Sequence, residues 1–211
     1  METVAFWRRY LPAMTVGGWS PDGLAEEIAR LEPLAQAVAE ARTQAKTVKQ
    51  AELAAFERIR SLNLNVPLLI AGRFDEGHPV RVALAAVYAV TPETDELNLL
   101  RARRLIPVWR KADAALAARK PGDAIVRDEA GVAEFETWVT DYPKTLQATV
   151  EAVTAFRAAR TALRSQHDRV DQLNKRAYKK FKAEAYTDPA LRSALQTAIT
   201  REKSSGSRRR Q

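Results

Sequence analysis

The amino-acid sequence predicts an all-α fold: an elongated four-helix-type bundle of two long helical hairpins with coiled-coil-like packing and short Pro-capped accessory helices. Alanine, the best helix former, supplies 38 of the 211 residues, whereas glycine supplies only eight. The segment 144–188 contains neither glycine nor proline, and its apolar residues recur at steps of three and four. A mean helix runs only about 11–12 residues, so this segment indicates an unusually long one.

The composition excludes several classes of protein. Hydrophobic residues make up 46% of the chain and charged residues 28%, which is typical of a globular protein. Cysteine is absent, which excludes disulfides and thiol chemistry. No apolar run is long enough to cross a bilayer, and the first residues lack the features of a secretory signal. We therefore expect no membrane insertion and a cytoplasmic location.

The net charge of +8 is unevenly distributed along the chain. Residues 1–100 hold 10 Arg and Lys against 13 Asp and Glu, whereas residues 101–211 hold 24 against 13. A solvated helical surface that is simply basic is one interpretation. A surface for a polyanion or an acidic partner is the other.

Three regions are predicted. Residues 1–19 form an aromatic segment interrupted by Gly17-Gly18, too short for a core helix of its own, whose side chains dock on the bundle or meet a partner. Residues 20–203 form a single helical-bundle domain. Residues 204–211 form a disordered basic tail.

The first half of the bundle begins with a clear helix start. Ser20-Pro21-Asp22 supplies a capping hydroxyl, a proline at the first helical position and an acid in the first turn. Helical spacing then continues to about Leu62, with a kink or break expected near Pro33. We expect residues 63–67 to stop this helix at Pro67.

The middle of the chain is punctuated by prolines. Residues 80–90 fit a strand or a helix, and their alanines favour a helix. Residues 91–93 repeat the capping pattern and predict a second helix, bent at Pro107 and ended by Pro121-Gly122. Residues 123–130 predict a loop, and the helix that follows is expected to break near Pro143.

The long helix predicts a coiled-coil seam made of two heptad lines. One line contains Leu146, Val153, Arg160, His167, Asn174 and Phe181, and the companion line contains Thr149, Phe156, Leu163, Val170 and Ala177. Three consecutive polar residues on the first line indicate either a poorly covered seam or pairing with another chain.

A weak internal repeat is also visible in the sequence. Ala55-Phe56, Ile59 and Pro67 match Ala177-Tyr178, Phe181 and Pro189 at a constant offset of 122 in residue number. Two similar helical hairpins would explain this match, and so would chance, because alanine-rich helices resemble each other.

The sequence offers little for catalysis or for metal and cofactor binding. The Glu-x-x-His pair of di-iron bundles is absent, and Asp75 and His78 fall in a glycine-containing loop. His167 is interpreted as a polar seam residue. No phosphate-binding loop and no nucleophile-base pattern are present. The sequence therefore predicts a protein that is not an enzyme, with no cofactor and no metal.

The best candidate site is the basic surface of the long helix, because like charges at three- and four-residue spacing repel one another and a counter-charge would help. Acids on a neighbouring helix of the molecule or external phosphates are the two possible sources of that counter-charge. The sequence thus predicts a non-catalytic helical scaffold or protein-interaction module, possessing a protein partner or associating with itself; the alternative is a nonspecific nucleic-acid or polyanion-binding protein. The candidate polyanion-binding residues are Arg157, Arg160, Arg164, Arg169, Lys175, Arg176, Lys179, Lys180 and Lys182.

Overall fold

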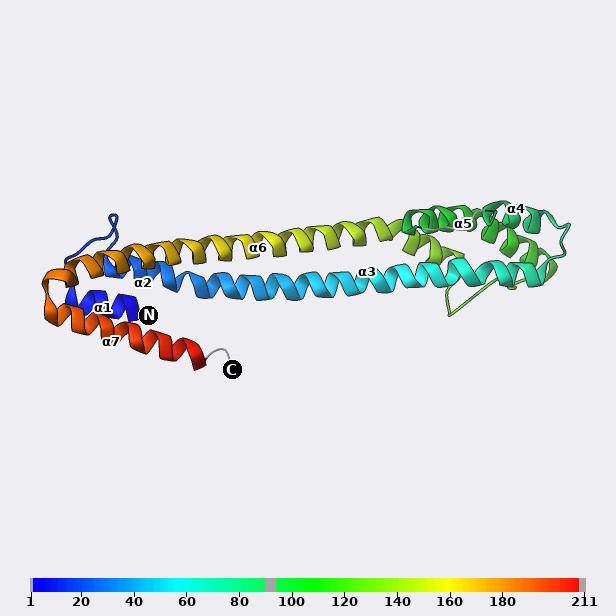
Figure 1. The fold of residues 1–211 in the computed structure, drawn as a ribbon. Helices are drawn as coiled ribbons and strands as arrows, with labels where there is room; N and C mark the ends of the chain where they lie inside the picture. Colours follow the sequence, from blue (N-terminus) through cyan, green and yellow to red (C-terminus); the bar gives the residue numbers. More distant parts are fainter. Residues whose placement is uncertain (1, 90–93, 209–211) are drawn as a thin grey trace. The chain divides into compact units, whose positions relative to one another are not determined.

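The computed structural model describes residues 2–89 and 94–208, and every element within these ranges is an α-helix (Figure 1). The all-α prediction is therefore confirmed. The helices are α1 (Glu2–Tyr10), α2 (Pro21–Ala29), α3 (Leu31–Arg73), α4 (Pro79–Val87), α5 (Asp95–Arg119), α6 (Val132–Thr187) and α7 (Pro189–Arg208).

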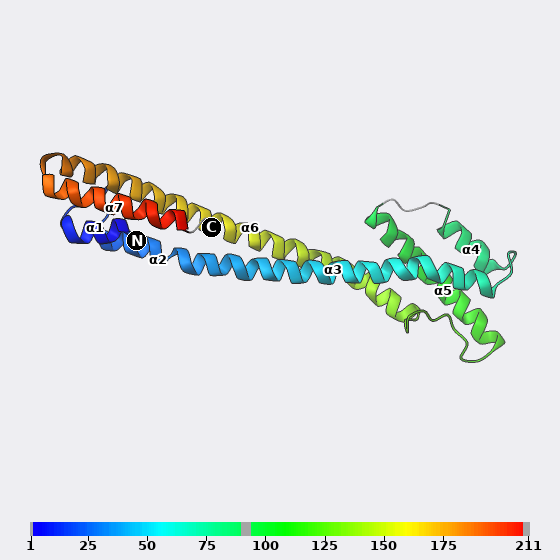
Figure 2. The same ribbon diagram turned by 60° about the horizontal axis from the view of Figure 1, so that its bottom comes forward.

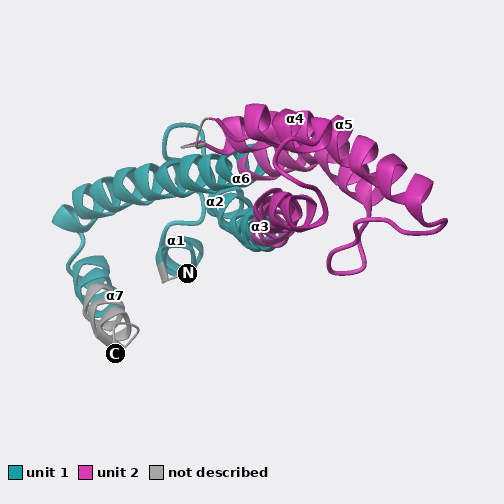
Figure 3. Ribbon diagram, turned by 90° about the vertical axis from the view of Figure 1, so that its right-hand side faces the viewer, with its two compact units in different colours: residues 1–43, 154–211 teal, residues 44–153 magenta. Residues whose placement is uncertain are grey.

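The chain divides into two compact units (Figure 3). Unit 1 comprises residues 1–43 and 154–211, and unit 2 comprises residues 44–153. Each of the long helices α3 and α6 contributes one part to each unit. The units thus cut across the range 20–203 that the sequence predicts as one domain.

The long helices α3 and α6 lie side by side (Figures 1 and 2), and each carries a heptad stripe of buried and partly buried residues. The stripe of α3 alternates by three and four along Leu31, Leu34, Val38, Ala41, Ala45, Val48, Glu52, Ala55, Ile59, Leu62 and Val66. The stripe of α6 does the same along Thr149, Ala152, Phe156, Ala159, Leu163, Gln166, Val170, Leu173 and Ala177.

Of the two seam lines predicted in the long helix, only the companion line is confirmed. Leu146, Arg160 and His167 are exposed, and the second buried line runs instead through Ala152, Ala159, Gln166 and Leu173. Val153 and Asn174 of the predicted line are partly buried and Phe181 is buried, so this line fails at Leu146, Arg160 and His167. The observed line is difficult to identify from sequence because it contains two alanines and a glutamine. The inference of a second chain from three polar seam residues therefore loses its basis.

The prediction that Pro67 stops the first long helix is wrong, because α3 continues through it to Arg73. A proline lacks the N–H that would bond to the carbonyl four residues earlier, here the carbonyl of Asn63. The Tyr88 hydroxyl donates to that oxygen at 2.5 Å. Residues on both sides of the proline, Val66 and Ile70 among them, are fully buried, and this burial favours continuation.

Replacing Tyr88 with Phe is expected to lower the free energy of unfolding by about 2 kcal/mol, since it leaves the Asn63 carbonyl without its donor. The cost should shrink in a Pro67→Ala background, where the substituted residue has an N–H of its own to donate to that carbonyl. Urea denaturation of the four proteins of this cycle measures the coupling. An equal cost in both backgrounds would contradict this role for the hydroxyl.

Two further helix boundaries differ from expectation in an informative way. The break predicted near Pro33 occurs at Arg30, between α2 and α3, so Pro33 lies in the first turn of α3. The break predicted near Pro143 does not occur, because α6 runs through it. Phe135, Val139 and Tyr142 are buried on one face leading up to this position, and their burial outweighs the cost of the proline.

The helices in the middle of the chain largely agree with those predicted from the sequence. Residues 80–87 are helical, as their alanines predicted. The predicted helix start at residues 91–93 lies outside the described residues, and Thr94 caps α5 by accepting from the Leu97 N–H. Helix α5 ends at Arg119, just before Pro121-Gly122, as expected.

In unit 1 the aromatic N-terminal segment folds onto the rest of the unit. It forms helix α1 after all, with Phe6 and Trp7 buried against Phe181 at ring-centroid distances of 5.2 and 5.6 Å. Docking within the chain, the first of the two predicted alternatives, is therefore confirmed.

At the end of unit 1, Asp188 caps α7 by accepting from the backbone of Ala190 and Leu191. Helix α7 extends to Arg208, whereas the sequence predicts a disordered tail from Ser204. Adding residues to an existing helix costs little compared with starting one, which is consistent with this extension.

The two units share one design. In unit 1, Trp7 donates Nε1–H to the Met14 carbonyl at 2.9 Å, two positions before a turn closed by Val16 and Trp19. In unit 2, Trp109 donates to the Ile125 carbonyl at 3.1 Å, again two positions before a turn, this time closed by Arg127 and Ala130. A step of 111 in residue number, hereafter the repeat offset, takes Met14 to Ile125 and the first turn to the second.

The repeat offset also aligns the cores of the long helices. Buried residues at equivalent positions include Leu24 and Phe135, Ile59 and Val170, Leu62 and Leu173, and Ile70 and Phe181. The structure is therefore a tandem repeat. The offset of 122 predicted from the sequence is wrong, because it equates Pro67, inside a helix, with Pro189, at the start of one.

The repeat predicts a stabilising substitution. Gly17 and Gly18 adopt φ of 57° and 82° in the first turn, whereas Asp128 and Glu129 adopt φ of 53° and 64° in the second. Glycine adopts this region freely and glutamate only at a cost, so Glu129→Gly is expected to raise the free energy of unfolding by about 1 kcal/mol. Thermal denaturation checks it, with Glu134→Gly, inside a helix, as a destabilising control.

Candidate functional site

The nine predicted polyanion-binding residues lie on α6 in unit 1, but they do not form one face. At about 100° per residue, the buried stripe through Gln166, Val170 and Ala177 defines the inner side of the helix. The predicted residues divide into three groups around the remaining circumference. Arg157, Arg164, Lys175, Lys179 and Lys182 point outward; Arg169, Arg176 and Lys180 lie on one flank; and Arg160 lies on the other flank.

The outward group, hereafter the cationic row, runs from Arg157 to Lys182 and is exposed to solvent. Lys175 is paired with Asp171 at 2.7 Å, and this hydrogen-bonded carboxylate raises the pKa of Lys175. Lys182 lies over the Tyr178 ring at 5.0 Å. Within the described part of the chain, Arg157, Arg164 and Lys179 form no ion pair, so the cationic row retains uncompensated positive charge.

The flank group is used inside the molecule. Lys180 donates to the Thr15 carbonyl at 2.7 Å, and the Arg176 guanidinium lies beside Gly17. Arg169 is stacked over the Trp19 ring at 5.0 Å. These three cations thus hold the segment that precedes α2, and the sequence did not distinguish them from the cationic row.

Arg169 also contacts a buried acid that the sequence analysis did not single out. Glu27 of α2 is 2% exposed and lies 3.0 Å from Arg30 and 3.3 Å from Arg169. The Gln166 side chain donates to both the carboxylate and the backbone carbonyl of Glu27, at 2.7 and 2.8 Å. Helical spacing placed Glu27 beside Leu24 and Leu31 on the apolar face, which is the signal that could have identified it.

The two units differ in net charge. Unit 1 holds 19 Arg and Lys against 11 Asp and Glu, whereas unit 2 holds 15 of each. The whole excess of +8 therefore belongs to unit 1. The field of this unit favours anionic partners.

The two histidines differ in their surroundings. His78 Nδ1 accepts from the Val80 N–H at 3.2 Å and so caps α4, while its ring lies 4.5 Å from the Phe74 ring. His167 is exposed on α6. The described residues contain no group of three side chains that could hold a metal ion.

Comparisons with known proteins add no relative: no family model matches the chain, and no curated protein or solved structure is significantly similar to it. None of the described helices combines the length and apolar character needed to span a membrane. Function is therefore inferred from the surfaces of the two units.

Proposed function

We propose that the protein is a non-catalytic helical interaction module, and one observation carries this proposal. In unit 2, Leu53, Leu64 and Leu68 lie within about 60° of one another on the outer face of α3, away from its buried stripe, and are 52%, 55% and 71% exposed. Exposed leucines gathered on one face are typical of a surface that another protein covers. A second copy of the chain or a different protein could supply the cover.

The leucine face is tested by the double variant Leu64→Glu, Leu68→Glu in the full chain. Self-association predicts a molar mass in light scattering that rises with protein concentration for the wild type and stays monomeric for the variant. Leu146→Glu, at another exposed leucine of the same unit, is the matched control and should behave as wild type.

A wild type that is monomeric at every concentration argues against self-association. The leucine face would then bind a different protein. Affinity capture then uses three baits: the wild type, the double variant Leu64→Glu, Leu68→Glu, and the control Leu146→Glu. A protein that binds the leucine face is captured by the wild type and the control and not by the double variant. If the double variant retains both its mass and its partners, the leucine face is not an interaction surface.

The cationic row favours a second function, nonspecific polyanion binding. Five outward cations along one helix, in the unit that holds the whole excess charge, suit contacts with successive phosphates. For five phosphate contacts on duplex DNA, the logarithm of the affinity should fall with the logarithm of salt concentration with a slope of about −4.5.

Charge-reversal variants distinguish phosphate contacts made by the cationic row from attraction by the net charge of unit 1. Lys179→Glu, Lys182→Glu should weaken binding to a duplex DNA oligonucleotide by about tenfold and reduce the salt slope by about 2. Arg176→Glu, Lys180→Glu carries the same change of net charge on the flank that faces residues 15–17, so it is the matched control. Equal loss in both variants would indicate the field of the unit, and no loss in either would exclude the row.

A further inference from the structure

The fold does not require leucine on the outer face of α3. The repeat offset takes the leucine face of unit 2 onto the cationic row of unit 1, so the same three places hold an arginine and two lysines there. A helix position that accepts an exposed cation in one unit needs no apolar side chain in the other. The leucines therefore indicate a surface that something covers. The equivalent pairs are Leu53 with Arg164, Leu64 with Lys175, and Leu68 with Lys179.

Two charged residues extend the leucine face into a heptad stripe. Glu57 and Arg60 lie between Leu53 and Leu64, and the four residues follow one another at steps of four, three and four, as in a coiled coil. Each of the four side chains is more than half exposed. Helix α3 thus carries a second seam, hereafter the outer seam, made of these four residues.

The outer seam is complementary to itself when two copies of α3 run antiparallel. A two-fold axis midway between Glu57 and Arg60 is also midway between Leu53 and Leu64. It therefore sets Leu53 opposite Leu64 and Glu57 opposite Arg60, and the symmetry makes each contact twice. Within one copy Arg60 lies 3.4 Å from Glu57, and a pair as exposed as this contributes little, so both charges can gain from a partner.

The equivalent stripe of unit 1 repels itself in the same arrangement. Two antiparallel copies would set cation opposite cation and acid opposite acid, and like charges across an interface oppose association. Of the two stripes, only the outer seam of unit 2 can pair with itself, and such a contact closes a dimer and does not extend into a fibre. The equivalents of Leu53, Glu57, Arg60 and Leu64 are Arg164, Asp168, Asp171 and Lys175.

From these observations we propose that a second copy of the chain covers the leucine face, by antiparallel pairing of the outer seams. This inference rests on the proposed function, because it names the partner of the leucine face and the register of the contact. Leu68 lies beyond the leucine layers and adds apolar surface at each end. One helix face per copy makes a small interface, so the dissociation constant should be on the order of 100 μM.

Charge variants test the pairing by sedimentation equilibrium of the full chain at up to about 1 mM, where the wild type should be mostly dimeric. Glu57→Arg sets arginine opposite arginine and Arg60→Glu sets glutamate opposite glutamate, so each should weaken dimerisation about tenfold. An equimolar mixture of the two variants restores opposite charges in both contacts and should dimerise as the wild type does. A monomeric wild type, or a mixture that associates no better than its components, would overturn the inference.

Single cysteines test the register, because the chain contains no cysteine of its own. A mixture of Leu53→Cys and Leu64→Cys should form a disulfide between the two variants under mild oxidation, since these places face each other. Neither variant alone should cross-link, because identical residues lie about 16 Å apart along antiparallel helices, beyond the reach of a disulfide. A disulfide between two chains of Leu53→Cys would indicate parallel pairing and rule out the proposed register.

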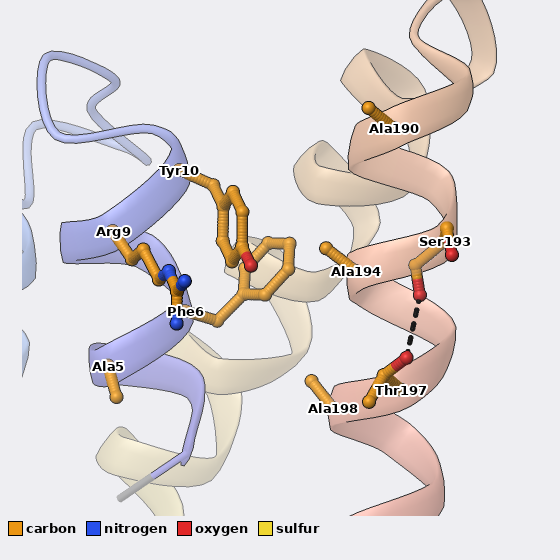
Figure 4. Close-up of a pocket in the computed structure, with 9 residues that line it drawn as sticks. All are labelled: Ala5, Phe6, Arg9, Tyr10, Ala190, Ser193, Ala194, Thr197 and Ala198. Carbon is orange, nitrogen blue, oxygen red and sulfur yellow. Dashed lines mark hydrogen bonds between the residues drawn. The ribbon is translucent and has the colours of Figure 1, made fainter.

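Arg9→Glu is the matched control for Arg60→Glu, because it makes the same change of charge at an exposed arginine of unit 1. Arg9 lines a groove of 610 Å³ between α1 and α7, where Phe6 and Tyr10 face small side chains of α7 (Figure 4). The variant should dimerise as the wild type does. An equal loss of dimer in Arg9→Glu would mean that net charge or this groove controls association, and the inference would fail.

The double variant Leu64→Glu, Leu68→Glu separates this inference from the proposed function. Dimerisation that the double variant abolishes and the charge variants leave unchanged would contradict the antiparallel seam, while the leucine face would remain an interaction surface. A double variant that keeps both its mass and its partners would remove the leucine face itself, and the inference with it.

Discussion

Replacing Trp109 with Ala is expected to lower the free energy of unfolding by about 4 kcal/mol, the largest effect that we expect of a single substitution in this protein. The Trp109 ring is completely buried and packs against Phe135 at a centroid distance of 5.6 Å. Its Nε1–H is the donor to the Ile125 carbonyl. The substitution therefore leaves both a cavity and an acceptor without a partner.

Trp109→Phe separates these two contributions, since it retains much of the ring and loses the hydrogen bond. A cost of about 1–2 kcal/mol is expected for it. Urea denaturation followed by circular dichroism measures both variants. Hydrogen exchange should show the loop between α5 and α6 opening, because the Asp113 carboxylate and Trp109 together hold Ile125 at its N–H and its carbonyl. A cost below about 1 kcal/mol for Trp109→Ala would contradict this role.

The second large effect concerns the buried carboxylate of Glu27. Replacing both Arg30 and Arg169 with Leu leaves this group, 2% exposed, without a cation. An uncompensated buried charge is strongly destabilising, and we expect a loss of about 3 kcal/mol in the free energy of unfolding. The arginine side chains are 60% and 52% exposed, which keeps this value at the lower end of the usual range.

Adding Glu27→Leu to that double variant should restore most of the lost stability, because the charge that had lost its partners is removed. Thermal denaturation of the wild type, the double variant and the triple variant makes the comparison. If the triple variant is no more stable than the double variant, the loss comes from the packing of the arginine stems, that of Arg169 on Trp19 included, and not from Glu27.

The sequence predicted the helix starts well and the helix continuity poorly, for a physical reason. Caps are local, so Ser20 could be identified from its neighbours in the chain. Whether a helix passes through a proline depends on distant groups. Tyr88 lies 25 residues from Asn63, whose carbonyl it bonds, and no local pattern shows this contact.

The candidate site was predicted only in part, for a related reason. Charge spacing along one helix identified the nine cations, but their separation into a cationic row and an inner flank depends on which side the segment before α2 covers. The repeat offset was missed because equivalent core positions hold different apolar residues, such as Ile70 and Phe181. Equivalent positions in the two units are buried alike, whereas a repeat is identified in a sequence by identical residues.

The division of the chain between the units has a consequence for the order of folding. Unit 2 is one continuous stretch, residues 44–153, whereas unit 1 joins residues 1–43 to residues 154–211. Closing a long loop costs entropy before its contacts form, so we expect unit 2 to assemble first and unit 1 last. During synthesis, residues 1–43 cannot complete unit 1 until residues 154–211 have been made. Phe6 and Trp7 therefore stay exposed to solvent until Phe181 has left the ribosome and can pack against them.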